Sequence, residues 1–399
     1  MNAQLLATQL EGLLSEELGS LVRRERTAYD LLTEPLNDSF VLFGAGVLGR
    51  RTLAGVRKLG IEPLAFTDNN SLLWGQTVDG LKVLSPVDAV HRFANLAPFV
   101  VAIWRDVGGH PVAKIREQLN AIAPTRVVSV GYLYWKYAEA LLPYYFLDLP
   151  HKIALQVDQV RAAFKLFSDD QSRIEYLAQL RWRLWLDFDG LPPPVSHPPY
   201  LPDDLFSTSA EEVFVDCGAY DGDTIERFLQ HQVQFSGRIF AFEPDVLNVA
   251  KLRSYVGSLP APTQERITIV PSAVGSRRQK VRMETTGTVQ SAVSNSGSAE
   301  AECVPLDEVL SDEAPTYVKM DIEGGEPEAL VGARSVIQSH HPVLAICVYH
   351  QFDHLWKLPL LVHSMSNDYS FFLRPQAEAC WDLVCYAVPL TRLKVKFKK

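Results

Sequence analysis

The sequence predicts an α/β protein that contains two doubly wound, Rossmann-like domains. Two observations predict this fold class. A run typical of a strand, a glycine turn and a helix occurs twice, at 39–59 and again at 212–229. In both places a second apolar strand follows, and an acidic residue comes about 25 positions after the first glycine of the turn. The length of 399 residues also exceeds that of one ordinary domain.

The composition excludes several classes of protein. The formal net charge is -9, whereas general nucleic-acid binding needs a basic face. The five cysteines are scattered and form no CxxC pair, which favours reduced thiols over a disulfide framework or a zinc site. No apolar stretch approaches the length of a membrane span, and no secretory signal is visible. We therefore expect a cytoplasmic protein with no nucleic-acid partner and no membrane span.

The chain divides into four predicted segments. These are an N-terminal helical segment at 1–36, a Rossmann-like domain at 37–150, a helical bridge with a proline-rich linker at 151–206, and a second α/β domain at 207–399. Leucines at helical spacing predict one amphipathic helix over 4–34. Such a helix packs on its own chain, which we favour, or holds a homo-oligomer together. Six prolines between positions 192 and 202 predict extended chain in the linker.

The first Rossmann-like domain carries a GxGxxG turn. Its strands are predicted at 39–43, 63–67, 99–104 and 126–130. The turn glycines are Gly44, Gly46 and Gly49, and Asp68 follows the second strand at the spacing of a ribose-binding acid. Phosphate groups bind at the N-terminus of the helix that follows such a turn. We expect a nucleotide or a nucleotide-sugar here, and the alternative is a degenerate turn without a ligand.

The second α/β domain has seven predicted strands. They lie at 212–217, 238–243, 267–271, 316–321, 343–349, 369–374 and 382–388. The first five alternate with helical segments, as a parallel sheet requires, and the last two favour an antiparallel hairpin at one edge. Residues 281–284 and 301–304 are predicted to pair as a separate hairpin.

The second glycine turn differs from the first because it is acidic. Gly218 and Gly222 provide the turn, and Asp216, Asp221 and Asp223 surround it. Carboxylates repel a pyrophosphate, so the turn suits a ligand with a cationic end. S-adenosylmethionine is such a ligand, because its sulfonium and amino groups are positive and its ribose needs a hydrogen-bond acceptor.

Residues 316–330, with the sequence TYVKMDIEGGEPEAL, make these features resemble one family. The segment is similar to the signature of the FkbM family of S-adenosylmethionine-dependent methyltransferases, in which a strand with the pattern Lys-x-Asp-x-Glu-Gly precedes a helix that begins with glutamate. The glycine turn, Glu243 and residues 369–374 resemble that family in the same order. The resemblance covers the chain from about 172 to about 389.

The resemblance implies a class I methyltransferase sheet with an antiparallel edge hairpin. It also implies transfer of a methyl group to a hydroxyl on a sugar, a polysaccharide or a secondary metabolite. The N-terminal domain resembles the nucleotide- or sugar-nucleotide-binding Rossmann modules that are fused to sugar-modifying enzymes. The expected partner is therefore a small-molecule or glycan acceptor.

Ligands of open parallel sheets bind beyond the carboxyl ends of the strands. We therefore assign the methionine part of the donor to the second glycine turn, the ribose hydroxyls to Glu243, and the adenine to the end of the third strand. The predicted cofactor-binding residues are Asp216, Gly218, Ala219, Tyr220, Asp221, Gly222, Asp223, Glu243, Pro244, Asp245, Ser272 and Ala273.

Four residues are candidates for the chemistry: Asp321, Lys319, Glu323 and His350. Asp321 is the preferred base or acceptor-orienting group, with Glu323 or His350 assisting. Lys319 lies on a core strand, so we expect it to pair with a carboxylate such as Asp321 or Glu323. A divalent cation held by Asp321, Glu323 and His350 is an alternative. Tyr369 and Arg374 either bind the acceptor or lock the edge hairpin.

Two other functions compete with methyl transfer. The first is a nucleotide-sugar or NAD-dependent oxidoreductase whose N-terminal domain is catalytic, but no tyrosine–lysine pair for hydride transfer is apparent there. The second is a binding protein with two relic Rossmann units, but the dense acidic residues at the strand ends speak against it.

Overall fold

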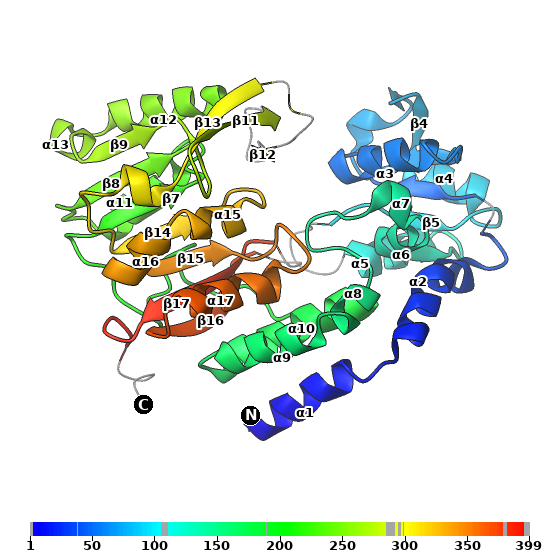
Figure 1. Ribbon diagram of the computed structural model, residues 1–399. Coiled ribbons are helices and arrows are strands. Elements are labelled where there is room, and N and C mark those ends of the chain that lie inside the picture. The colour runs from blue at the N-terminus through cyan, green and yellow to red at the C-terminus, as the bar shows by residue number, and fades with distance from the viewer. Residues whose placement is uncertain are drawn as a thin grey trace.

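The computed structural model describes residues 3–37, 39–104, 111–188, 190–284, 292–293, 297, 299–377 and 381–394. Figure 1 shows two sheet-containing units side by side, with a group of helices along one side of both. This arrangement confirms the predicted α/β fold with two Rossmann-like units. Within the described part of the chain, every helix is too short or too polar to cross a lipid bilayer. The division of the chain at positions 36, 150 and 206 stays a prediction.

The N-terminal segment forms two helices where one was expected. Helix α1 spans Ala3–Leu13 and α2 spans Leu18–Thr33. The break follows from local competition for backbone groups, because the Ser15 hydroxyl donates to the carbonyl of Gly12 at 2.8 Å. Glu17 then adopts an extended conformation before α2 begins. Helix α1 packs on α10 (Asp170–Trp185), and α2 packs on α6 (Val130–Lys136), so both contact their own chain.

The first sheet has six strands in the order β3-β4-β2-β1-β5-β6. Their bounds are β1 Val41–Phe43, β2 Ala65–Thr67, β3 Thr77–Val78, β4 Leu81–Leu84, β5 Phe99–Val101 and β6 Val127–Ser129. All pairs are parallel except β3 with β4. The connecting helices are α3 Val47–Arg57, η1 Ser71–Leu73, α4 Pro86–Phe93 and α5 Pro111–Asn120, and α6 leads into α7 Ala138–Leu141.

The bridge is helical, as predicted, and it supports the edge of the second sheet. Helix α8 spans His151–Ala154 and α9 spans Val157–Leu166. Helix α10 begins at an N-cap, since the Asp169 carboxylate accepts from the backbone of Ser172 at 2.9 Å. Figure 1 shows α9 and α10 passing below β16 (Tyr369–Pro375) and α17 (His354–Met365), and these elements are in contact.

The second sheet has seven strands in the order β16-β17-β15-β14-β7-β8-β9. The remaining bounds are β7 Val213–Cys217, β8 Arg238–Phe242, β9 Ile267–Val270, β14 Tyr317–Met320, β15 Val343–Cys347 and β17 Leu383–Pro389. Strands β9, β8, β7, β14 and β15 are parallel, and β17 runs antiparallel to β15 and β16. The predicted edge hairpin is therefore present, and all five parallel strands end at one edge.

Helices connect the parallel strands of this sheet. They are α11 Asp223–His231, α12 Val246–Ser258, α13 Ala261–Gln264, α14 Leu306–Val309, α15 Glu326–Val331 and α16 Arg334–His340. A smaller sheet lies between β9 and β14 in the sequence, with β10 Ala273–Val274, β11 Gln279–Glu284, β12 Ala292–Val293 and β13 Ala299–Val304. The predicted hairpin is its antiparallel β11–β13 pair.

Candidate active site

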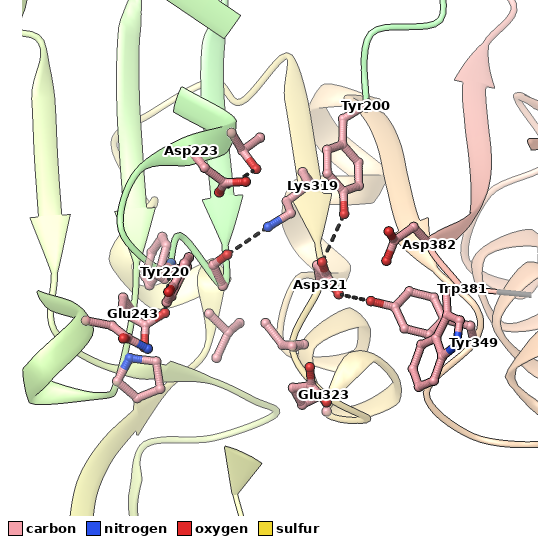
Figure 2. A pocket seen from close by; sticks show the side chains of 18 of the residues that line it. Tyr200, Tyr220, Asp223, Glu243, Lys319, Asp321, Glu323, Tyr349, Trp381 and Asp382 are labelled. Carbon is pink, nitrogen blue, oxygen red and sulfur yellow. Dashed lines mark hydrogen bonds between the residues drawn. The ribbon is translucent and has the colours of Figure 1, made fainter. Parts of the chain in front are cut away.

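A cavity of about 500 Å³ opens at the carboxyl ends of β7, β8 and β14. Its wall carries five carboxylates, and Arg227 and Lys319 are its cationic side chains among the described residues. Figure 2 shows Glu243 and Tyr220 at one side of the cavity and Asp321, Tyr349 and Trp381 at the other. The five carboxylates belong to Asp223, Glu243, Asp321, Glu323 and Asp382.

The turn after β7 requires glycine for two physical reasons. Gly218 has φ +83°, which L-residues with a side chain rarely adopt, and an added Cβ would lie 2.0 Å from the carbonyl oxygen of Asp321. Gly222 has φ +96°, and an added Cβ would lie 2.5 Å from the Tyr255 ring. The backbone amides of Gly218 and Ala219 both donate to the carbonyl of Phe242 at 3.0 Å. The turn is thereby held close to the end of β8.

Glu243 links that turn to the end of β8. One carboxylate oxygen accepts from the amide of Tyr220 at 3.0 Å, and the other accepts from the amide of Asp245 at 2.9 Å. Burial raises the pKa of Glu243, although these hydrogen bonds oppose the rise. Glu243 lines the cavity beside Pro244. Asp245 is the N-cap of α12, where its carboxylate accepts from the amide of Leu247 at 2.8 Å.

Asp216 and Lys319 lie beneath the turn and face each other across β7 and β14. Their side chains are buried, and Lys319 Nζ is 2.9 Å from Asp216 Oδ1. We expected a carboxylate partner such as Asp321 or Glu323, but the ion pair joins Lys319 to Asp216. The parallel register of β7 and β14 places the two residues opposite each other, and sequence periodicity does not reveal that register. Lys319 also donates to the carbonyl of Gly218 at 2.7 Å.

Asp321 lies on the side of the cavity opposite Glu243. Tyr200 donates to its Oδ2 at 2.9 Å and Tyr349 donates to its Oδ1 at 3.1 Å. Burial acts to raise the pKa of Asp321, but contact with His350 and the positive charge of Lys319 outweigh it and hold the pKa well below its ordinary value. The carboxylate therefore stays ionised at neutral pH and can orient a hydroxyl, but it is a weak base.

Glu323 has the opposite electrostatic character. Burial raises its pKa to about 7, and the negative charge of Asp321 acts in the same direction. Its backbone has φ +52°, and its Oε2 accepts from the hydroxyl of Tyr145 at 3.2 Å. A carboxylate with a pKa near neutral is suited to accept a proton at physiological pH. The two neighbouring carboxyl groups thus differ in their electrostatics, since the pKa of Asp321 is lowered and that of Glu323 is raised.

His350 lies behind the cavity wall with no exposed side-chain surface. Its Nε2 is 3.2 Å from Asp321 Oδ1 and 3.9 Å from Glu323 Oε1. Its other ring nitrogen, Nδ1, is 2.8 Å from Glu326 Oε1. In the described parts of the chain, no group of three His, Cys, Asp or Glu side chains is arranged to hold a metal ion. The structure therefore offers no support for the alternative of a divalent cation.

The other residues predicted to bind the methyl donor do not all line the cavity. Asp223 lines the cavity and pairs with Arg227 at 2.7 Å. Ser272 and Ala273 also line the cavity, on the side of β9. Tyr220 lines the cavity as well, whereas Asp221 is half-buried in the turn.

Several cavity residues were not identified from the sequence. Tyr200 comes from the proline-rich linker, Tyr145 from the segment before α8, and Trp381 with Asp382 from the β16–β17 turn. Tyr349, which also lines the cavity, could have been identified from the sequence, because it precedes His350 at the end of a predicted strand. Trp104 and Tyr144, with Val47 and Leu48 of α3, show that the N-terminal half forms part of the wall.

Nearby residues already contact part of the GxGxxG turn. The Asp68 carboxylate accepts from the amide of Ala45 at 2.7 Å and from that of Asn70 at 2.8 Å. An added Cβ on Gly49 would lie 1.8 Å from the carbonyl oxygen of Gly44, so close packing of helix and strand explains this glycine. Gly46 has open space around it. A nucleotide at Gly44, Gly46, Gly49 and Asp68 stays a prediction.

Tyr369 and Arg374 hold the fold together. The Tyr369 hydroxyl donates to the carbonyl of Pro342 at 3.0 Å. Arg374 is buried and lies 2.7 Å from Asp169 and 3.0 Å from Asp204. It therefore ties the edge hairpin to the bridge and the linker.

The chain is similar to one family model and to a solved structure. Residues 216–371 match the model of the family described as "Methyltransferase FkbM domain". A crystal structure of methyltransferase FkbM from Methylobacillus flagellatus KT superposes with a TM-score of 0.76 at 22% identity, covering 94% of this chain and 99% of that one. At this identity the likeness shows the fold.

A fibrillarin pre-rRNA processing protein from Methanococcus jannaschii has a TM-score of 0.28 at 9% identity. The alignment covers 46% of this chain and 70% of that one. No curated protein matches the chain.

Proposed function

We propose that the chain is an S-adenosylmethionine-dependent methyltransferase that methylates a hydroxyl group, because residues 216–371 match the family model described as "Methyltransferase FkbM domain". The acceptor would be a sugar, a polysaccharide terminus or another small molecule. The observation that carries the proposal is one acidic cavity that has Glu243 at one side and Asp321 with Glu323 at the other. The family match lies in the C-terminal half, which does not favour an oxidoreductase centred on the N-terminal domain.

The side chains around the glycine turn fit this donor. Glu243 is 5% exposed, lies at the end of β8 and can accept hydrogen bonds from a ribose diol. Gly218 and Tyr220 of the turn line the cavity, and Gly218 lies close to the carbonyl of Asp321. The excess of carboxylates on the wall favours a ligand that carries positive charge. The bound donor would supply an activated methyl group on sulfur.

Asp321 and Glu323 support a hydroxyl acceptor. The Asp321 carboxylate, fixed by Tyr200 and Tyr349, can accept a hydrogen bond from a hydroxyl and orient it. Glu323 can take the proton of that hydroxyl as the methyl group is transferred.

Aromatic side chains form much of the remaining wall on the acceptor side, and they suit the apolar face of a ring-shaped acceptor. These are Trp104, Tyr144, Tyr145, Tyr349 and Trp381.

Calorimetric titration of S-adenosylmethionine and S-adenosylhomocysteine tests the donor site. We expect binding to the wild-type chain and at least a roughly tenfold loss of affinity, about 1.4 kcal/mol, in Glu243→Gln. Glu226→Gln is the matched control, because this exposed residue of α11 makes the same change of charge outside the cavity. If folded wild-type protein binds neither compound, the donor assignment is wrong.

Mass-spectrometric screening of neutral glycosides and cyclic alcohols tests the acceptor. A product that is 14 mass units heavier, about the mass of one CH2 group, should form with the wild type and be strongly reduced in Asp321→Asn. Amines screened in parallel are the control, and methylation of an amine nitrogen without methylation of any alcohol would contradict the proposal of a hydroxyl acceptor.

A further inference from the structure

A buried cluster behind the cavity involves Glu326, which begins the helix of the 316–330 signature but was not among the predicted site residues. Glu326, His350 and His354 are 0%, 5% and 1% exposed. Glu326 Oε1 is 2.8 Å from His350 Nδ1, and Glu326 Oε2 is 3.4 Å from His354 Nδ1. None of the three lines the cavity as described. The cluster therefore acts on any ligand only through other residues.

Glu326 is joined to the segment that carries the candidate catalytic acids. It is the first residue of α15, and its Oε1 accepts from the amide of Ile322 at 3.0 Å. This bond closes the turn that runs from Asp321 through Glu323 to the helix. His350 follows β15, the strand that pairs with β14 on the other side. One carboxylate thus contacts both the turn backbone and the imidazole.

The two ring nitrogens of His350 each face a carboxylate. Nδ1 faces Glu326 at 2.8 Å and Nε2 faces Asp321 at 3.2 Å. A neutral imidazole has one N–H, and its other nitrogen would present a lone pair to a carboxylate oxygen. An imidazolium carries an N–H on each nitrogen, so it can donate to Glu326 and places its positive charge 3.2 Å from Asp321 Oδ1. The position of the imidazole between two carboxylates therefore favours a protonated His350.

The electrostatic surroundings agree with that charge. Burial acts to lower the pKa of His350, but the charges of Glu326 and Asp321 raise it well above the ordinary value. The pKa of Glu326 is lowered, because its interactions with His350 outweigh its burial. His354 stays neutral, since burial lowers its pKa to about 4.

Groups from neighbouring elements also face the cluster. The Tyr349 ring lies 4.1 Å from the His350 ring and the Tyr145 ring lies 6.3 Å from it, measured between centroids. Asp353, the N-cap of α17, and Lys357 within that helix add their charges beside His354. Glu323 Oε1 is 3.9 Å from His350 Nε2.

We propose that Glu326 is a positioning residue, which through His350 keeps the Asp321 carboxylate ionised and fixed in orientation at the acceptor side of the cavity. Glu326 touches no ligand itself. The catalytic role of Glu326 rests on the proposed function. Its coupling to His350 and Asp321 is a property of the free protein. It can therefore be measured without the acceptor.

NMR of the full chain labelled with 15N-histidine tests the coupling. The chain has ten histidines, and His350→Gln identifies the signal of His350. In the wild type, His350 should keep both ring protons at pH values at which a free imidazole side chain, whose reference pKa is about 6.5, has lost one. In Glu326→Gln the proton affinity of His350 should fall roughly tenfold or more.

Glu328→Gln is the matched control, because this exposed residue of α15 makes the same change of charge and should leave His350 unaltered. If Glu326→Gln does not fold, Glu326→Asp keeps the charge, and its shorter side chain should still lower the proton affinity of His350. A wild-type His350 that titrates like an exposed histidine overturns the proposal, and so does a folded Glu326 variant with unchanged titration.

Titration of S-adenosylhomocysteine into the same samples separates this proposal from the proposed function. Donor affinity should be the same in Glu326→Gln and wild type, because Glu326 lies outside the cavity wall. Absence of donor binding to the wild type would overturn the proposed function and leave the His350 result standing.

Discussion

Lys319 and Asp216 form a buried ion pair that connects the two central strands of the second sheet. The distance from Nζ to Oδ1 is 2.9 Å, and the side chains are 2% and 0% exposed. The same ammonium group donates to the carbonyl of Gly218, so it fixes the glycine turn to β14. Burial raises the pKa of Asp216 to about 6, and the charge of Lys319 opposes that rise. The pair thus supports the glycine-turn side of the cavity.

Replacing Lys319 by methionine should destabilise the protein. The change leaves Asp216 without its buried partner, so the free energy of unfolding should fall by about 3–5 kcal/mol. Urea denaturation measures the loss. Lys357→Met is the control, since Lys357 is half exposed beside Asp353 and should cost at most about 1 kcal/mol. Equal stability of the two variants would show that the Lys319–Asp216 pair does not hold the fold.

Gly218→Ala should weaken binding of the methyl donor. The new methyl group would meet the carbonyl of Asp321 at 2.0 Å, and the backbone conformation with φ +83° would be strained. The turn must then move away from β14. Calorimetry with S-adenosylhomocysteine should show a loss of affinity of roughly tenfold or more.

Gly257→Ala is a suitable control for that variant. Gly257 lies in α12 and has nothing within 4 Å of an added Cβ, so alanine should stabilise the helix by up to about 1 kcal/mol. Unimpaired donor binding in Gly218→Ala would contradict the role of this turn.

Methyl transfer should increase with pH around neutrality. Glu323 has a pKa of about 7, so it is protonated and inactive as a base below that pH and ionised above it. Initial rates of S-adenosylhomocysteine formation, with an acceptor from the screen, measure this profile. Glu323→Gln should remove the rise, and a wild-type rate independent of pH would exclude Glu323 as the base.

Tyr145→Phe should move the same profile to higher pH. The Tyr145 hydroxyl donates to Glu323 at 3.2 Å, and this hydrogen bond lowers the pKa of the carboxyl group. Tyr132→Phe is the control, because the Tyr132 hydroxyl bonds to the carbonyl of Trp185 and is no part of the cavity wall as described. Identical profiles for wild type and Tyr145→Phe would show that the two residues are not coupled.

Arg374→Met should lower the free energy of unfolding without changing the binding of the methyl donor. The guanidinium is 1% exposed and pairs with Asp169 and Asp204, so its loss leaves two carboxylates without their shared cation. We expect a loss of about 3–5 kcal/mol in the free energy of unfolding. Arg278→Met, at an exposed ion pair, should change stability by about 1 kcal/mol or less. If only acceptor turnover changes in Arg374→Met, Arg374 belongs to the acceptor site instead.

The order of helices and strands was predictable because it depends on local patterns. Strands such as 343–347 are continuous apolar runs, and alternation with helices specifies a parallel sheet. The prediction of one helix over 4–34 was wrong, because the Ser15 hydroxyl competes for a backbone carbonyl. The spacing of hydrophobic residues does not reveal this competition. Residues at strand ends, such as Glu243 and Asp321, were selected since parallel strands bring their carboxyl ends to one edge.

The amino-acid pattern alone thus specifies the fold class, the glycine turn and the acids beside it, because each depends on residues that are near in the sequence. The partners of those acids depend on packing between distant segments. Tyr200 reaches Asp321 across 121 positions, and Tyr145 reaches Glu323 across 178. Strand register likewise pairs Lys319 with Asp216. Such contacts arise only when the sheets, the bridge and the linker pack together, and no local spacing encodes them.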